Sequence, residues 1–420
     1  MPARTRTILL LALAELGAMA LWFSASAVVP QLKAEWAISD AAASWLTMTV
    51  QLGFVCGALI SAITNLADRF PAQRVFAISA LLGALFNALI PLTEPPLFIV
   101  LALRFLTGVC LAGVYPTGMK LMATWTAKGR GLAIGLLVAA LTAGSALPQL
   151  FGALAESGVL SNLAASAENQ TAPPLPAWPI VLYCASASAV IGALIAHFVV
   201  TPGPLLPPAR TFSWKHAAKV VTDPPLRLIN LGYLGHMWEL YAMWAWAPIL
   251  IDLSYKSAGY PKWSAHLAAF TIIAIGAVGC VIAGALADRT GRSRITIIAM
   301  AVSGACALTA GFLTASPVLL TAVCLLWGLT IIADSAQFSA GASELCDPHY
   351  VGTALTMQTC LGFLLTALPI RLVPEIRDAF PQLGWAAAFM FLGIGPISGI
   401  IAMTRLRARP ESIKMASGLR

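Results

Sequence analysis

Long apolar stretches constrain this chain more than any other feature of its sequence. A hydrocarbon core about 30 Å thick needs roughly 20 apolar residues of helix to cross it. Stretches of about that length recur along the whole chain, at residues 7–29, 42–65, 74–92, 97–121, 130–153, 178–200, 227–251, 264–287, 294–315, 317–342, 351–372 and 384–404. Their apolar runs are continuous rather than alternating, which excludes a transmembrane β-barrel. The pattern predicts an all-α integral membrane protein with 12 transmembrane helices.

Composition agrees with a membrane protein. Hydrophobic residues make up 59% of the chain and charged residues only 10%, whereas a soluble domain carries about 25% charged residues. The cysteines lie in or beside apolar stretches without metal-like spacing, so we interpret them as free thiols and predict neither a metal nor another cofactor. The first apolar stretch runs from about Ile8 to Val29 and contains Glu15. It is too long for a signal-peptide core, and we interpret it as a retained helix.

Basic residues lie mostly on one side of the predicted membrane. With the N-terminus inside, the inside segments hold 19 of the 25 Lys and Arg residues and the outside segments hold 5. This bias predicts that both termini are cytoplasmic. It also accounts for the net charge of +8 without a nucleic-acid partner. We expect a monomeric, multi-pass protein of a bacterial-type inner (plasma) membrane.

Two polar stretches divide the chain. Residues 201–225 form a predicted cytoplasmic linker between an N-terminal six-helix bundle, residues 1–200, and a C-terminal six-helix bundle, residues 226–406. Residues 154–177 form a predicted external loop, and residues 407–420 a basic cytoplasmic tail. Because none of these stretches holds an uninterrupted apolar run long enough to cross a membrane, they mark the boundaries of the predicted domains.

The two halves resemble each other at an offset of 220 to 224 residues. Three segments match: Glu15–Trp22 with Glu239–Trp246, Ala146–Pro148 with Ala367–Pro369, and Asp68-Arg69 with Asp288-Arg289. This register predicts that Glu15 and Glu239 lie at similar depths, and it aligns Asp334 with Leu111. Two pseudo-symmetric repeats of six helices place a solute site near the midplane, at their interface.

Three motifs resemble those of the major facilitator superfamily. The segment Gly284–Arg294, GALADRTGRSR, is similar to the superfamily's loop signature between helices 8 and 9. The first copy, Thr64–Arg74, departs from the signature at Thr64 and Pro71, where glycine is usual. The segment Arg104–Gly108 resembles the RxxxG motif of the fourth helix. With the 12-span layout, the resemblance covers essentially the whole chain.

The resemblance implies a secondary transporter that works by alternating access and whose loop signatures control its gating. The implied gating residues are Asp68, Arg69, Gly284, Asp288, Arg289, Gly291 and Arg292. A physical interpretation supports this role, because Gly284 allows close helix packing and Asp288 can meet a neighbouring helix N-terminus. Arg289, Arg292 and Arg294 are expected to stay at the anionic inner surface of the membrane.

Six ionisable residues lie at membrane depth, where an unpaired charge costs several kcal/mol. They are Glu15, Arg104, Lys120, His236, Glu239 and Asp334. The resemblance implies that helices 1, 4, 7 and 10 line the cavity, and all six residues fall on those helices. We therefore interpret them as substrate or proton sites, with Trp22, Tyr115 and Trp238 as aromatic surfaces of the same cavity.

Some of these residues could instead have a purely structural role. Glu15 could form an ion pair with Lys120, and Arg104 could hydrogen-bond to the backbone of helix 1. His236 lies three residues from Glu239, hence on the same helical face, and a histidine beside a carboxylate suits proton coupling. Asp334 could be a second protonation site or the partner of His236.

The leading hypothesis is a proton-coupled carrier of a small organic solute, an anion or zwitterion held near Arg104 and Lys120. The alternative is a proton-driven multidrug efflux antiporter, although Leu147 precedes Pro148 where the antiporter motif has glycine. A membrane sensor without transport is a remote alternative. An enzyme is not expected, because no catalytic triad, metal cluster or phosphate loop is present in the sequence.

Overall fold

The computed structural model describes residues 3–93, 95–126, 130–159, 176–205 and 212–420, and the side chains of residues 3, 67–68 and 130–132 are outside this description. Regular structure in these ranges is helical. The N-terminal half contains α1 (Ala3–Met19), η1 (Ser26–Val28), α2 (Val29–Trp36), α3 (Asp40–Thr64), α4 (Leu66–Arg69), α5 (Ala72–Thr93), α6 (Leu97–Leu111), α7 (Tyr115–Trp125), α8 (Arg130–Glu156) and α10 (Ala177–Phe198).

The C-terminal half repeats this order. It contains α11 (Trp214–Thr222), α12 (Pro224–Ser257), α13 (Lys262–Ala274), α14 (Gly276–Thr290), α15 (Arg292–Ala310), η2 (Gly311–Leu313), α16 (Pro317–Ile331), α17 (Ser335–Leu345), η3 (Pro348–Tyr350), α18 (Val351–Ala379), α19 (Trp385–Leu392), α20 (Ile394–Arg407) and η4 (Pro410–Gly418). The linker helix α11 lies inside the stretch that the sequence predicted to be a plain linker.

Ten helical stretches of the described chain are long and apolar enough to cross a membrane. They coincide with ten of the predicted spans. The other two predicted spans contain α1, which stops after 17 residues, and α12, whose middle carries Asn230, His236 and Glu239. These polar residues interrupt the apolar run of α12.

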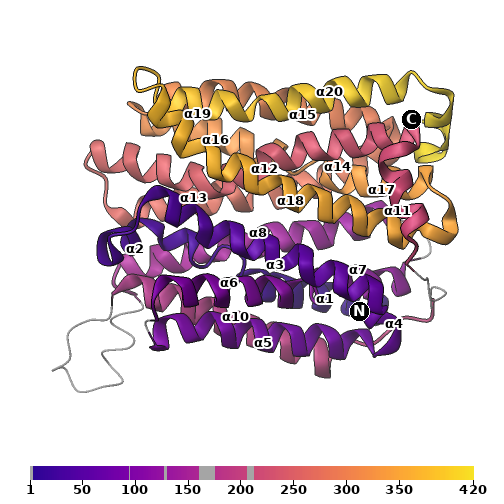
Figure 1. The fold of residues 1–420 in the computed structure, drawn as a ribbon, viewed down its shortest axis with the longest axis horizontal. Coiled ribbons are helices and arrows are strands. Elements are labelled where there is room, and N and C mark those ends of the chain that lie inside the picture. The colour runs from indigo at the N-terminus through magenta and orange to yellow at the C-terminus, as the bar shows by residue number, and fades with distance from the viewer. Residues whose placement is uncertain (1–2, 94, 127–129, 160–175, 206–211) are drawn as a thin grey trace.

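The two halves form two layers of helices that run side by side along the long axis (Figure 1). Contacts between the halves are made by α8 with α13 and α14, and by α3 with α18. Both labelled chain ends lie at the same end of the bundle (Figure 1). This arrangement agrees with an even number of crossings.

Five predicted helices are divided: the first, fourth, eighth, tenth and twelfth, the eighth at Ile275 and the twelfth at Gly393. The first was predicted as one helix over residues 7–29, but α1 ends at Met19 and turns follow before η1. The fourth and tenth each divide in two. The breaks follow Leu111 and Ile331, and the flanking helices have equal lengths, 15 residues for α6 and α16 and 11 for α7 and α17.

Small residues allow the helices of each half to pack closely. A Cβ atom on Gly108 of α6 would overlap the carbonyl oxygen of Val50, and one on Gly53 of α3 would overlap that of Phe105. The matching contact in the other half joins Gly328 of α16 to the backbone of α13. Backbone contact of this kind requires glycine.

We expect Gly108→Ala to destabilise the protein, because the added methyl group forces α3 and α6 apart. Overpacking of this kind costs about 1–3 kcal/mol. The control is Gly352→Ala at the start of α18, where an added Cβ meets nothing within 4 Å. Thermal unfolding in detergent measures both, and equal melting temperatures for the two variants would contradict the packing account.

Candidate functional site

His236 and Asp334 form a buried pair in the C-terminal half. The atoms His236 Nδ1 and Asp334 Oδ1 are 2.8 Å apart, and the two side chains are 1% and 2% exposed. Asp334 lies at the break between α16 and α17, directly before the first residue of α17. The contact is short, yet Oδ1 of Asp334 receives no well-directed hydrogen bond from a described residue. The prediction that Asp334 could be the partner of His236 agrees with this geometry.

Glu239 lies one helical turn beyond His236 and has different partners. Its carboxyl oxygens accept hydrogen bonds from Ser303 Oγ at 3.0 Å and from Trp327 Nε1 at 2.7 Å. It is buried against α15 and α16. Both partners are neutral, so the carboxyl group of Glu239 is held without a permanently charged donor.

Glu15 lies on α1 in the N-terminal half and is fully buried. Neither of its carboxyl oxygens makes a hydrogen bond to a described residue. The helix α7 approaches closely at Gly118, where an added Cβ would lie 2.6 Å from Glu15 Oε2. Lys120 lies on the same helix and is partly buried. A hydrogen-bonded ion pair between Glu15 and Lys120, the structural alternative, is not formed.

Arg104 is fully buried on α6 and binds the broken end of α1. The guanidinium group donates to backbone and side-chain oxygens at Leu21 O (3.0 Å), Trp22 O (2.6 Å), Ser24 Oγ (3.0 Å), Leu46 O (3.3 Å) and Asn87 Oδ1 (3.2 Å). Carbonyl groups that the break leaves without helical partners are thus satisfied. The geometry favours the structural interpretation of Arg104, and it explains why the first helix can break at this point.

We expect Arg104→Lys to lower stability by about 3 kcal/mol or more, because an ammonium group cannot replace the planar set of donors and leaves buried carbonyls unpaired. The matched control is Arg69→Lys, an exposed site. Differential scanning fluorimetry measures the loss. An Arg104→Lys protein that is as stable as wild type but no longer binds solute would instead assign Arg104 to the substrate site.

The packing of the glycines corrects the repeat register for helices 1 and 7. A Cβ on Gly17 of α1 would meet Ser188 O and Gly192 N of α10. In the C-terminal half, a Cβ on Gly235 of α12 would meet the equivalent atoms of Gly395 and Gly399. Gly17 therefore corresponds to Gly235.

In this register, Tyr233 is the counterpart of Glu15 and Leu21 is the counterpart of Glu239. Six residues of α-helix separate Tyr233 from Glu239, which is about 9 Å along the axis. The prediction that the two glutamates lie at similar depths is wrong. The equal lengths of the broken helices likewise align Asp334 with Val114, not with Leu111.

An aromatic cluster joins the two halves. Its members are Trp22 and Phe23 from the break after α1, Phe54 from α3, Tyr241 and Trp244 from α12, and Phe363 from α18. Ring centroids of Phe54 and Phe363 lie 4.6 Å apart, and those of Trp22 and Phe363 lie 5.1 Å apart. Trp22 was predicted from the sequence to line the cavity, but no local sequence pattern pointed to Phe54 or Phe363.

The other two aromatic candidates lie elsewhere. Trp238 packs on Phe391 of α19 with centroids 5.0 Å apart and donates to its carbonyl oxygen. It therefore belongs to the packing inside the C-terminal half. Tyr115 is the first residue of α7, directly after the break in the fourth helix, and is partly buried.

The second loop signature forms a charge cluster. Gly291, with φ of +99°, connects α14 to α15. Arg292 donates to both carboxyl oxygens of Glu344 at 2.7 and 2.8 Å and to Gln337 at 2.9 Å, and it lies 3.6 Å from Asp288. Arg292 is 7% exposed, and its position at the anionic inner surface of the membrane remains a prediction. No sequence motif pointed to its partner Glu344 as a residue of this cluster.

The remaining gating residues fit their predicted positions in part. Gly284 is buried, and Arg289 and Arg69 are exposed. The side chain of Asp68 lies outside the described residues. The predicted basic tail packs on the same cluster: Met415 is buried, and the amide of Ala416 donates to Glu344 at 3.1 Å.

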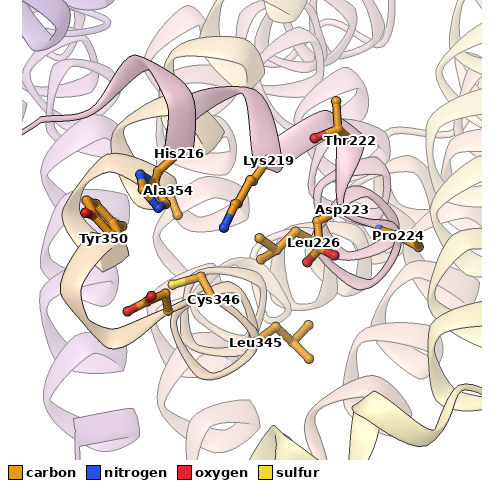
Figure 2. A pocket seen from close by; sticks show the side chains of 11 residues that line it. His216, Lys219, Thr222, Asp223, Pro224, Leu226, Leu345, Cys346, Tyr350 and Ala354 are labelled. Atoms are coloured by element: carbon orange, nitrogen blue, oxygen red, sulfur yellow. The ribbon is translucent and has the colours of Figure 1, made fainter.

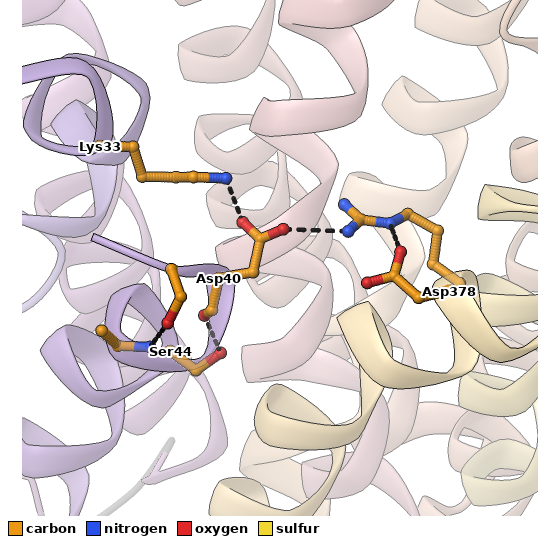
Figure 3. Close-up of polar contacts among 7 residues, drawn as sticks. Lys33, Asp40, Ser44 and Asp378 are labelled. Atoms are coloured by element: carbon orange, nitrogen blue, oxygen red, sulfur yellow. Dashed lines mark hydrogen bonds and ion pairs between the residues drawn. The ribbon is translucent and has the colours of Figure 1, made fainter. Parts of the chain in front are cut away.

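An ion-pair network joins the two halves at the end of the bundle that the sequence predicts to be external. Asp40, at the start of α3, accepts from Lys33 and from Arg377 Nη2 of α18, the latter at 2.9 Å (Figure 3). Arg377 also donates to Asp378 at 2.7 Å. A second contact at this end joins His266 of α13 to Gln149 of α8 at 2.7 Å. Asp40 and Arg377 are 337 positions apart in the sequence, so a local sequence pattern could not predict that they pair.

A surface hollow of about 370 Å³ lies between α11 and the segment that joins α17 to α18. Figure 2 shows Lys219 and His216 of α11 facing Cys346 and Tyr350. His216 stacks on Tyr350 with centroids 3.3 Å apart. Partial burial, followed by the positive charge of Lys219, lowers the pKa of His216. The stack fastens the linker helix to the C-terminal half.

Comparison with protein families decides the identity of this fold. The model of the Major Facilitator Superfamily matches residues 11–369. The chain belongs to the Major Facilitator Superfamily. The resemblance seen in the loop signature and the RxxxG motif is confirmed. No curated protein matches the chain.

Solved structures of other major facilitators share the fold. A bacterial homolog to the human lysosomal transporter Spinster, inward-facing and unoccupied, is 16% identical with a TM-score of 0.70, covering 97% of this chain and 96% of that one. Its occupied form has a TM-score of 0.66 at the same identity and coverage. The proton:xylose symporter XylE is 13% identical with a TM-score of 0.69, covering 96% of each chain. Identities this low establish the fold and leave the substrate open.

Two further predictions concern cofactors and thiols. Within the described part of the chain, no group of three or more His, Cys, Asp or Glu side chains could hold a metal ion. The cysteines are free thiols, as predicted: Cys56, Cys110, Cys184, Cys280, Cys306, Cys324, Cys346 and Cys360. The site is therefore described by its titratable and aromatic side chains.

Proposed function

We propose that this protein is a proton-coupled secondary transporter that moves a small organic solute across the inner membrane by alternating access. It crosses the membrane 12 times, has both termini in the cytoplasm and acts as a monomer. Membership of the superfamily supports the transport mechanism. The proton coupling is supported by the buried carboxyl groups of Glu15, Glu239 and Asp334.

The main support for proton coupling is the environment of the Glu239 carboxyl group. It is buried, its hydrogen bonds come from neutral groups, and the titratable His236–Asp334 pair lies one turn away. A charged carboxylate in such a place is costly, so we expect proton binding and release to accompany each change in its exposure to water. Glu15 supplies a second such carboxyl group in the other half.

The Asp40–Arg377 bridge indicates which side of the membrane this conformation is closed to. It ties α3 to α18 at the predicted external end and supports a state closed to the outside. The bridge breaks when the halves rock apart. Asp288, Arg292 and Glu344 hold the loop of the opposite end within the C-terminal half and regulate its opening.

The sequence favoured an anion or zwitterion because Arg104 and Lys120 lie at membrane depth. Arg104 donates to oxygens of the protein itself, so it does not support an anionic solute. Proton-driven efflux of drugs or toxic compounds is the second candidate function, favoured by the aromatic cluster between the halves.

Reconstitution into liposomes tests the proposal. Radiolabelled solute flux should respond to an imposed pH gradient in vesicles with protein and not in vesicles without it. Uptake driven by an acidic exterior indicates symport, and extrusion driven by the same gradient indicates antiport. Flux that is insensitive to the gradient in both directions would refute proton coupling.

A further inference from the structure

The aromatic cluster between the halves carries an inference about the solute itself. We propose that the protein transports a flat, largely apolar and uncharged aromatic compound with a hydrogen-bond acceptor, which binds between Trp22 and Trp244. The inference rests on the proposed function, because it assumes that the interface between the halves is the transport site.

The cluster lies where a transported solute must pass. Trp22 contacts Tyr241 and Phe363 across the interface, with centroids 5.8 and 5.1 Å apart, and Phe23 contacts Trp244 at 5.7 Å. These rings come from opposite halves, so rocking of the halves separates them. A flat ring between them replaces the ring–ring contacts that are lost.

Two indole groups of the cluster lack partners. Nε1 of Trp22 and Nε1 of Trp244 are buried, with the side chains 1% and 2% exposed, and neither has a hydrogen-bond acceptor among the described residues. An indole N–H can only donate, and a buried donor is normally paired. An acceptor oxygen or nitrogen on the solute supplies the missing partner.

Other tryptophans of this chain show that the two unpaired groups are exceptions. Five indole N–H groups donate to protein oxygens, those of Trp125, Trp178, Trp238, Trp246 and Trp327. These five lie outside the cluster. Among the described residues, buried indole N–H groups without an acceptor occur only at Trp22 and Trp244, both in the cluster.

The charge of the cluster limits the class of solute. Its six side chains are aromatic, and only the phenol of Tyr241 is ionisable. A permanent anion finds no cation among them, and a permanent cation leaves both indole donors unpaired. A sugar needs many polar partners, and six rings offer too few. A neutral aromatic solute with one or two acceptors matches both the rings and the donors.

Quenching of tryptophan fluorescence tests the inference on the purified full chain. The probes are coumarin and related one- to three-ring carbonyl heteroaromatics, naphthalene as the flat ring without an acceptor, xylose as a sugar and tetraphenylphosphonium as a cation. We expect saturable binding of carbonyl heteroaromatics, with affinity at least about tenfold above that of the other three. Failure of every heteroaromatic to bind, or tighter binding of xylose or the cation, overturns the inference.

Matched variants locate the site. Trp22→Phe and Trp244→Phe keep a ring but remove the donor, and each should weaken coumarin binding about five- to tenfold. Trp246→Phe removes an indole that already donates to Ile370 O, and binding should stay at the wild-type value. Equal affinity in all three variants would place the solute elsewhere.

The two failures are distinguishable. Fluorescence binding needs no proton gradient, so binding that persists while flux ignores the gradient refutes the proposed coupling and leaves the solute class standing. Gradient-driven proton flux with a non-aromatic solute refutes the proposed solute class and leaves the proposed proton coupling standing.

Discussion

Replacing Glu239 with glutamine is expected to abolish accumulation of solute driven by a pH gradient, while exchange at equal pH continues. The amide oxygen can still accept from Trp327 Nε1 and the amide nitrogen can donate to Ser303 Oγ, but the side chain carries no exchangeable charge. One pH unit corresponds to about 1.4 kcal/mol, so one-to-one coupling supports about tenfold accumulation. Wild-type vesicles should approach that ratio, and Glu239→Gln vesicles should reach the external concentration only.

Two companion variants make this result specific. Glu15→Gln removes the buried carboxyl of the other half and tests whether it shares the coupling. Glu375→Gln is the control, since this carboxyl is 52% exposed and pairs with Arg371 on its own helix. If both buried-site variants accumulate solute as wild type does, neither glutamate carries the proton.

Breaking the external bridge is expected to expose the interface between the halves to the outside. Asp40→Asn removes the charge that holds Arg377 and Lys33. A partly buried pair of this kind contributes about 1 kcal/mol, which shifts the balance between closed and open states about fivefold. A cysteine in place of Ser44, one turn below Asp40 and 2% exposed, reports the change.

Labelling of Ser44→Cys by a membrane-impermeant maleimide should become about fivefold faster in the Asp40→Asn background. Arg371→Gln is the control, because its partner Glu375 lies on the same helix and does not bridge the halves. Exchanging the charges, with Asp40→Arg and Arg377→Asp together, should restore slow labelling. Unchanged labelling in Asp40→Asn would show that the bridge does not close the external end.

The helical membrane fold follows from the sequence because continuous apolar runs in a bilayer permit little else. The break after Met19 does not follow from it, since the stretch 7–29 contains no proline and Glu15 is its one charged residue. What allows the break is Arg104, 83 residues from the carbonyl oxygen of Leu21 that it binds. A local pattern contains no information about such a partner.

The site could be predicted only in part. Of the two alternatives for Asp334, its contact with His236 agrees with the structure. The register between helices 1 and 7 failed because apolar, alanine-rich segments match at several offsets, and close packing at Gly17 and Gly235 decides among them. Glu344 and Arg377 were missed because exposed-looking charges near helix ends are common, and only the fold shows which ones are paired.

Solute-induced proton movement tests the central claim most directly. Wild-type protein is reconstituted into liposomes that contain the pH indicator pyranine, with equal pH on both sides, and a carbonyl heteroaromatic is added outside. The account predicts a pH change inside the vesicles that saturates with solute and is absent in Glu239→Gln vesicles. Solute entry without any change in internal pH, in vesicles shown to be proton-tight, would contradict it.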